Sequence, residues 1–177
     1  MNNDDLRYPV GKFQRPGEFD AAQFQSFVSN IEQFPALVLQ EVDSLTPEQL
    51  DWIYRPGGWT IKQVVHHCAD SHMNAFIRTK LALTEDQPTI KPFLEAEWAK
   101  QVDYSVPIIQ SIKILEGIHL RWSVLLKSLE EEQLHRSFLH PENGKEWSLY
   151  FTIALYSWHC RHHLGHVKAA KKYKGRF

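Results

Sequence analysis

The chain has 177 residues, of which 43% are apolar and 23% are charged, enough for one domain whose core folds without disulfide bonds or a structural metal. Its 20 basic and 21 acidic residues give a formal net charge of −1, so it lacks the basic excess of most proteins that bind nucleic acids or anionic membranes. We therefore expect neither nucleic acid nor membrane as a partner.

The cellular location is predicted from three further features. No apolar run approaches the roughly 18 residues of a membrane span. The first residues, Met1–Asp5, lack the basic start and apolar stretch of a secretory signal. The two cysteines, Cys68 and Cys160, do not form a CxxC motif. These features together predict a cytoplasmic protein with reduced thiols.

Residues 1–18 are predicted to form an extended arm, because their prolines and glycines resist helix formation. A first long helix is predicted from about Asp20 to Leu45, where apolar residues recur every three or four positions. Pro35 lies inside this pattern and should kink the helix or split it in two. A short helix should then begin at Thr46, which is followed by proline and, at the capping-box position, Gln49.

The second long helix is predicted to begin after Thr60, because Gln63 completes a second capping box. It should end near Thr84. Residues 85–104, with two prolines, are predicted to form a long connection.

A third long helix is predicted from about 107 to 129. Residues 138–147 contain the tight-turn signal Glu142-Asn143-Gly144 and predict a small hairpin. Ser148 should cap a fourth long helix, which runs to about Lys172. The segments Leu45–Leu50 and Leu129–Leu134 resemble each other, and each precedes a histidine-bearing helix. We therefore predict an all-α, four-helix bundle in a single domain, residues 1–177.

Four of the ten histidines lie within eight residues of the fourth helix. His159 and His163 are four residues apart, and so are His162 and His166. The members of each pair project from one face of a helix and can give two nitrogens to a divalent transition metal. The spacing alone does not choose between the two pairs.

A third nitrogen could come from the second helix. His67 shares a polar face with four other residues of that helix: Gln63, Ser71, Asn74 and Arg78. Such a face is usually exposed to solvent, but it can line an internal polar site. A metal held by three neutral imidazoles would keep an open position, where a bound water can reach a pKa of about 7. Three histidines would therefore favour catalysis over a purely structural metal.

Other candidate groups are assigned structural or supporting roles. Cys68 and Cys160 each follow a candidate ligand and therefore point about 100° away from it, so core packing is expected. His119 is expected to be a buried, hydrogen-bonded residue rather than a fourth ligand. Asp70, Asn74 or another polar residue should support the metal ligands. There is no HExxH motif, P-loop, GxGxxG or GxSxG.

Several longer stretches carry a resemblance to a known family. These are Tyr54–Thr60, Val64–His67, Asp70–Asn74 and Trp158–His166. With them the chain resembles the YfiT-type branch of the DinB superfamily, metal-dependent hydrolases that are related to bacillithiol- and mycothiol-dependent transferases. The resemblance covers nearly the whole chain.

The resemblance implies a four-helix bundle that forms a homodimer and binds one nickel or zinc ion per chain through His67, His159 and His163. Three functions remain open. The chain could be a metal-dependent hydrolase of a small molecule, or a thiol S-transferase that passes a low-molecular-weight thiol to an electrophile. It could also be a non-catalytic metal-binding stress protein. The resemblance does not identify a catalytic acid or base.

Overall fold

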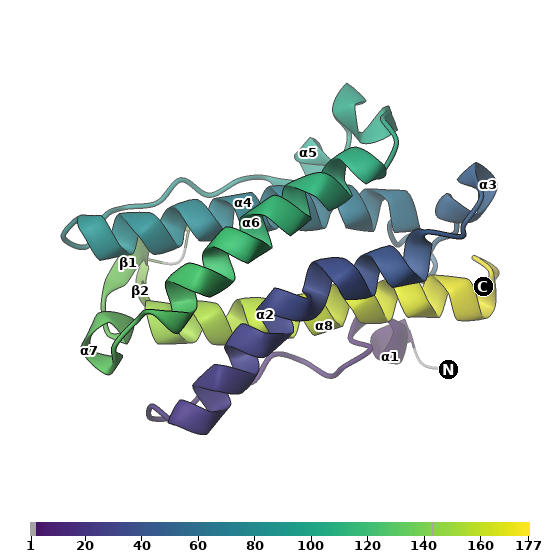
Figure 1. Ribbon diagram of the computed structural model, residues 1–177. Helices are drawn as coiled ribbons and strands as arrows, with labels where there is room; N and C mark the ends of the chain where they lie inside the picture. Colours follow the sequence, from purple (N-terminus) through teal and green to yellow (C-terminus); the bar gives the residue numbers. More distant parts are fainter. Residues whose placement is uncertain (1–2, 143) are drawn as a thin grey trace.

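Four long helices dominate the computed structural model, which describes residues 3–142 and 144–177 (Figure 1). They are α2 (Ala21–Val42), α4 (Ile61–Thr84), α6 (Ile109–Lys127) and α8 (Leu149–Tyr173). Helix α2 packs against α6 and α8, and α4 packs against the same two helices. The consecutive helices α2 and α4 therefore lie on a diagonal of the bundle. The predicted all-α, four-helix architecture is confirmed.

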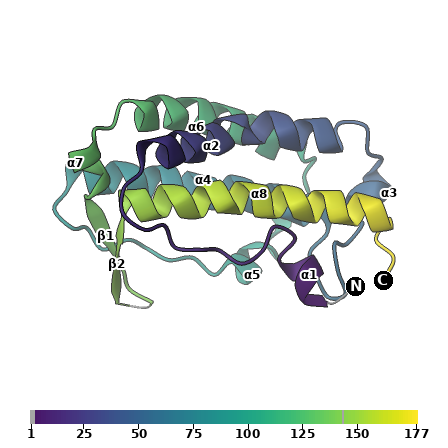
Figure 2. The ribbon, with the colours of Figure 1, turned by 90° about the horizontal axis from the view of Figure 1, so that it is seen from below.

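The helix directions explain the long connection between α4 and α6. In Figure 1, α4 and α6 run in the same direction, whereas α2 and α8 run in the opposite direction. The chain must therefore return along the whole bundle between α4 and α6. The return segment contains the short helix α5 (Glu95–Trp98) and the 3₁₀ helix η1 (Val102–Ser105). It crosses one side of the α4–α8 pair (Figure 2).

Side-chain caps set the start of three of the four long helices, α2, α4 and α8. The hydroxyl of Thr60 accepts a hydrogen bond from the backbone of Gln63, whose side chain completes the capping box. Ser148 accepts from the backbone of Phe151 in the same way. Helix α2 contains Pro35 but remains one continuous helix, so the split that its proline suggested does not occur.

The N-terminal arm differs in part from the prediction. Residues Asn3–Arg7 form the short helix α1. Two acidic residues in its first turn and an arginine in its last turn interact favourably with the helix dipole. The arm then follows α8 without regular structure, and the indole N–H of Trp158 donates to the carbonyl of Gly11 at 3.0 Å. Residues 1–2 of the predicted arm lie outside the described residues.

The predicted hairpin precedes α8. Strands β1 (Ser137–His140) and β2 (Lys145–Ser148) pair antiparallel; Asn143 of the predicted turn lies outside the described residues. Two further short helices, α3 (Pro47–Leu50) and α7 (Glu131–Leu134), occupy the two similar sequence segments, and each starts with a capping box. The sequence similarity between the two halves therefore extends to local structure.

The core lies between the four long helices and contains both aliphatic and polar groups. Trp122, Ile153 and His72 are each fully buried there. Cys68 and Cys160 are buried and free, as expected for core residues. In the part of the chain that the structure describes, no helix has both the length and the apolar character that crossing a bilayer requires.

Candidate metal centre

The antiparallel neighbours α4 and α8 bring His67 together with His159 and His163. One ring nitrogen from each of the three lies within 4.8 Å of the others. His67 Nε2 is 3.3 Å from His159 Nε2. Two nitrogens bound tetrahedrally at about 2.0–2.1 Å from a zinc ion are also about 3.3 Å apart. His67 and His163 are buried, and His159 is half-buried.

A second group of three histidines lies on α8 alone. His162, His163 and His166 also have one nitrogen each within 4.8 Å of one another. His163 belongs to both groups. The structure therefore brings together both i,i+4 pairs that the spacing left open, but in these groups only the pair of His159 and His163 meets a histidine of a second helix.

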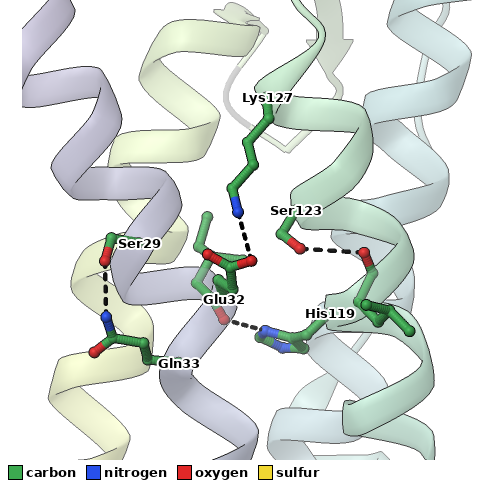
Figure 3. A network of polar contacts seen from close by, with 8 residues as sticks. Ser29, Glu32, Gln33, His119, Ser123 and Lys127 are labelled. Carbon is green, nitrogen blue, oxygen red and sulfur yellow. Dashed lines mark hydrogen bonds and ion pairs between the residues drawn. The ribbon is translucent and has the colours of Figure 1, made fainter.

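Hydrogen bonds assign the proton of His159. The Nδ1–H of His119 donates to the carbonyl oxygen of Ile31 on α2 (Figure 3). In a neutral ring the other nitrogen of His119 is then an acceptor, and it takes a hydrogen bond from His72 Nδ1 at 2.7 Å. His72 Nε2 accepts in turn from His159 Nδ1 at 3.0 Å. Because His159 carries its proton on Nδ1, its Nε2 lone pair faces His67.

His163 is held in the same way from the other side. His166 Nε2 donates to the carbonyl oxygen of Arg7 at 3.2 Å. The Nδ1 atom of His166 is therefore an acceptor, and it lies 3.3 Å from His163 Nδ1. His163 thus carries its proton on Nδ1 and has a free lone pair on Nε2. We call these two chains, His72–His119 and His166–Arg7, the supporting relays.

Burial keeps these imidazoles neutral, which metal binding requires. Burial lowers the pKa of His67 and His119 to about 4, and burial followed by repulsion from His162 lowers the pKa of His166 to about 3. The pKa values of His159 and His163 lie well below their ordinary value, first through burial and then through neighbouring histidines. Neutral, converging nitrogen donors fit a divalent transition metal.

The prediction that Asp70 or Asn74 supports the metal ligands is wrong. The Asp70 carboxylate accepts from the hydroxyl of Tyr104 at 2.7 Å, and Asn74 donates to the backbone carbonyl of Asp70. Among the described residues, His67 Nδ1 has no hydrogen-bond partner. Other polar residues, the histidines of the relays, take the supporting role. His119 is buried and hydrogen-bonded, as predicted.

Sequence reasoning missed the relays as a unit. His72 and His119 lie on the inner apolar stripes of α4 and α6, and an ionisable group at such a position needs a hydrogen-bond partner. That signal marks both residues, but their link to His159 depends on how three helices pack.

Two cavities adjoin the three histidines. One, of about 500 Å³, extends from His159 along α4 and α8 toward the hairpin. The other, of about 340 Å³, is bordered by His67, His159 and His163 together with residues of the N-terminal arm. Glu95, on α5, borders both cavities. Desolvation, and then repulsion from Glu142, raises the pKa of Glu95.

Comparison with known proteins identifies the family of the chain. A profile of the DinB superfamily matches residues 30–167, and the chain belongs to this superfamily. The chain is also similar to individual proteins of known sequence or structure.

Two relatives bear the name "Putative metal-dependent hydrolase". One, from Geobacillus kaustophilus, is 47% identical over 174 residues, covering 97% of each chain. The other, from Oceanobacillus iheyensis, is 46% identical over 168 residues, covering 95% of this chain and 97% of the relative. Among solved structures, YfiT from Bacillus subtilis is described as a probable metal-dependent hydrolase with an unusual four-helix bundle topology. It matches with a TM-score of 0.92 and 38% identity, over 97% of this chain and 98% of its own.

Proposed function

We propose that this chain is a metal-dependent hydrolase that holds one divalent metal, nickel or zinc, through His67, His159 and His163. The observation that carries the proposal is the convergence of the three ring nitrogens, with the free lone pairs of His159 and His163 fixed by the supporting relays. The names of the relatives support the hydrolase class.

The second group of histidines is less suited to a metal. In that group, His163 Nδ1 and His166 Nδ1 are already paired with each other, and His166 Nε2 is bonded to Arg7. Among the described residues, His162 Nδ1 is buried without a hydrogen-bond partner, but both nitrogens of His166 are already engaged. Binding an ion there would break the relay that holds His163.

The chemistry follows from the number of protein ligands and from the cavities. A divalent metal with three imidazole ligands keeps a position for water, lowers the pKa of that water to about 7 and polarises a substrate oxygen. The protein supplies the remaining functions. His67, His159 and His163 face cavities that admit a small molecule, and Glu95 borders both. We propose that the Glu95 carboxylate accepts the proton of the attacking water, because its raised pKa makes it a stronger base.

The experiment is a product analysis on protein loaded with nickel or zinc. A panel of small esters, amides and electrophiles is offered with and without a low-molecular-weight thiol. The proposal predicts hydrolysis that does not need the thiol and that is lost in His163→Ala. Products that carry the thiol, and form only when it is added, would replace the proposal with an S-transferase. No turnover with any member of the panel would favour a non-catalytic metal-binding protein.

The proposal includes a homodimer and a cytoplasmic location. Helix α6 exposes Leu120 and Val124, with 68% and 63% of their surfaces accessible, and neighbouring apolar groups on one helix face favour association. Sedimentation velocity should give a single species of twice the chain mass. The two free, buried cysteines accord with a reducing compartment.

A further inference from the structure

Arg78 is a buried cation that has no partner of opposite charge in the part of the chain that the structure describes. It lies on α4, three helical turns beyond His67, and is only 7% exposed. One guanidinium nitrogen donates to the carbonyl oxygen of Lys91 at 2.8 Å. Within residues 3–142 and 144–177, it forms no ion pair with a carboxylate. Burying an unpaired charge costs free energy, so packing alone does not explain an arginine at this position.

The larger cavity links Arg78 to the candidate metal centre. Both Arg78 and His159 border this cavity of about 500 Å³. Ser71, which lies one turn beyond His67, also borders it, and Arg78 lies seven positions further along the helix. This separation corresponds to about 10 Å along the helix axis. The cavity is therefore elongated, with His159 toward one end and the guanidinium toward the other.

The wall between the two ends is largely apolar. Phe93 and Leu155 border the cavity, as does Trp147. The ring of His140 stacks on Trp147 at 4.5 Å between centroids. The charge of Arg78 contributes, after burial, to lowering the pKa of His140, so His140 is neutral and adds no charge to the wall.

Acidic residues determine which part of the cavity accepts a negative charge. Glu95, Glu97 and Glu142 border the same cavity and are exposed. Repulsion between Glu142 and Glu95 contributes to the raised pKa of Glu95. An anion among these carboxylates would be repelled, whereas an anion at Arg78 would gain charge-assisted hydrogen bonds in a bidentate geometry.

We propose that this cavity binds a small substrate with an apolar body and one terminal carboxylate, which pairs with Arg78. The reacting bond then lies beside His159, at the other end of the cavity from the carboxylate. Only the position of the reacting bond rests on the proposed function; the anion site rests on Arg78 and the cavity alone. Arg78 acts as a specificity residue and takes no part in the chemistry.

The test measures binding to chelator-treated, full-length protein, so that a carboxylate cannot bind to a metal instead. The probes are hexanoate, neutral hexanamide and inorganic phosphate, followed by calorimetry or NMR titration. The wild-type protein should bind hexanoate about tenfold or more tightly than hexanamide, equivalent to about 1.4 kcal/mol. Inorganic phosphate, which has no apolar body, should bind more weakly than hexanoate.

The variants assign the preference to one side chain. Arg78→Met should bind hexanoate and hexanamide equally, whereas Arg121→Met, which removes an exposed arginine of α6, should keep the full preference. Arg78→Lys is the second variant, in case Arg78→Met does not fold. It keeps the charge but loses the guanidinium fork, so it should show an intermediate preference for hexanoate over hexanamide. Equal binding of hexanoate and hexanamide by the wild type would overturn the proposal, and so would an unchanged preference in both Arg78 variants. Hexanoate binding is measured without metal or turnover, so its failure is distinct from a failure of the hydrolase proposal.

Discussion

Removing His119 should weaken metal binding even though His119 is not a proposed ligand. In His119→Leu, the carbonyl oxygen of Ile31 loses its donor and His72 Nδ1 loses its acceptor. His72 can then move its proton to Nε2 and donate to His159 Nδ1. That change places the proton of His159 on Nε2, the nitrogen that should bind the metal.

The size of the effect follows from the two lost hydrogen bonds. A buried donor left without a partner costs about 1–3 kcal/mol, and removing a group that supports a metal ligand typically costs about 10–100-fold in metal affinity. We therefore expect nickel or zinc to bind His119→Leu about 10–100-fold more weakly, which equals about 1.4–2.7 kcal/mol. The melting temperature of the metal-free protein should fall by about 2–4 °C per kcal/mol lost.

The assay is competition for the metal against a chromophoric chelator, with His119→Gln as the matched control. The Gln side chain can still accept from His72 and donate to Ile31, so it should restore most of the affinity. In the metal-free wild type, ¹⁵N NMR should also report a proton on Nδ1 of His159, and in His119→Leu a proton on Nε2. Metal affinity in His119→Leu within twofold of the wild type, with the Nδ1 proton retained, would refute the relay.

Three further outcomes are expected. The metal-free protein should lose stability as the pH falls from about 6.5 to about 4. In this range the unfolded chain takes up protons on histidines such as His67 and His119, whereas burial lowers the pKa values of these two residues to about 4 in the folded protein. Urea unfolding at pH 7 and pH 5 should therefore show that the free energy of unfolding falls by up to about 1.4 kcal/mol per pH unit for each such histidine. Chelator-treated protein should keep its helical circular dichroism at neutral pH and melt at a lower temperature, because the core is apolar and the metal binds only the folded chain; loss of most of the helical signal would make the metal structural. Glu95→Gln should bind metal normally but lower any hydrolytic activity about 10²–10⁴-fold, and unchanged activity would remove Glu95 from the mechanism.

Most of the fold could be predicted because local signals determine it. The helical period of the apolar residues and the caps at Thr60 and Ser148 place the long helices within a few residues. The short helix at residues 3–7 was not predicted, because five residues are too few to show the helical period of apolar positions. Pro35 does not split its helix, since packing of α2 against α6 and α8 stabilises the continuous helix.

The candidate site could be predicted only in part. The spacing on α8 identified two histidine pairs, and the resemblance singled out His159 and His163 with His67. Asp70 was the wrong choice of support, because it is three residues from His67 and faces Tyr104 of the return segment instead. The relays could not be found from spacing, since His72, His119 and Ile31 come from three different helices. Their alignment is a property of the packed bundle.

The metal content of three purified proteins tests the central claim most directly. The wild type should hold one nickel or zinc ion per chain by elemental analysis. His163→Ala should hold almost none, because it loses a proposed ligand, whereas His162→Ala should keep close to one ion per chain, because His162 is outside the proposed ligand set. Loss of the metal in His162→Ala would contradict the assignment of His67, His159 and His163, because His163 belongs to both histidine groups and His162 to the other one alone; full metal content in His163→Ala would contradict it as well.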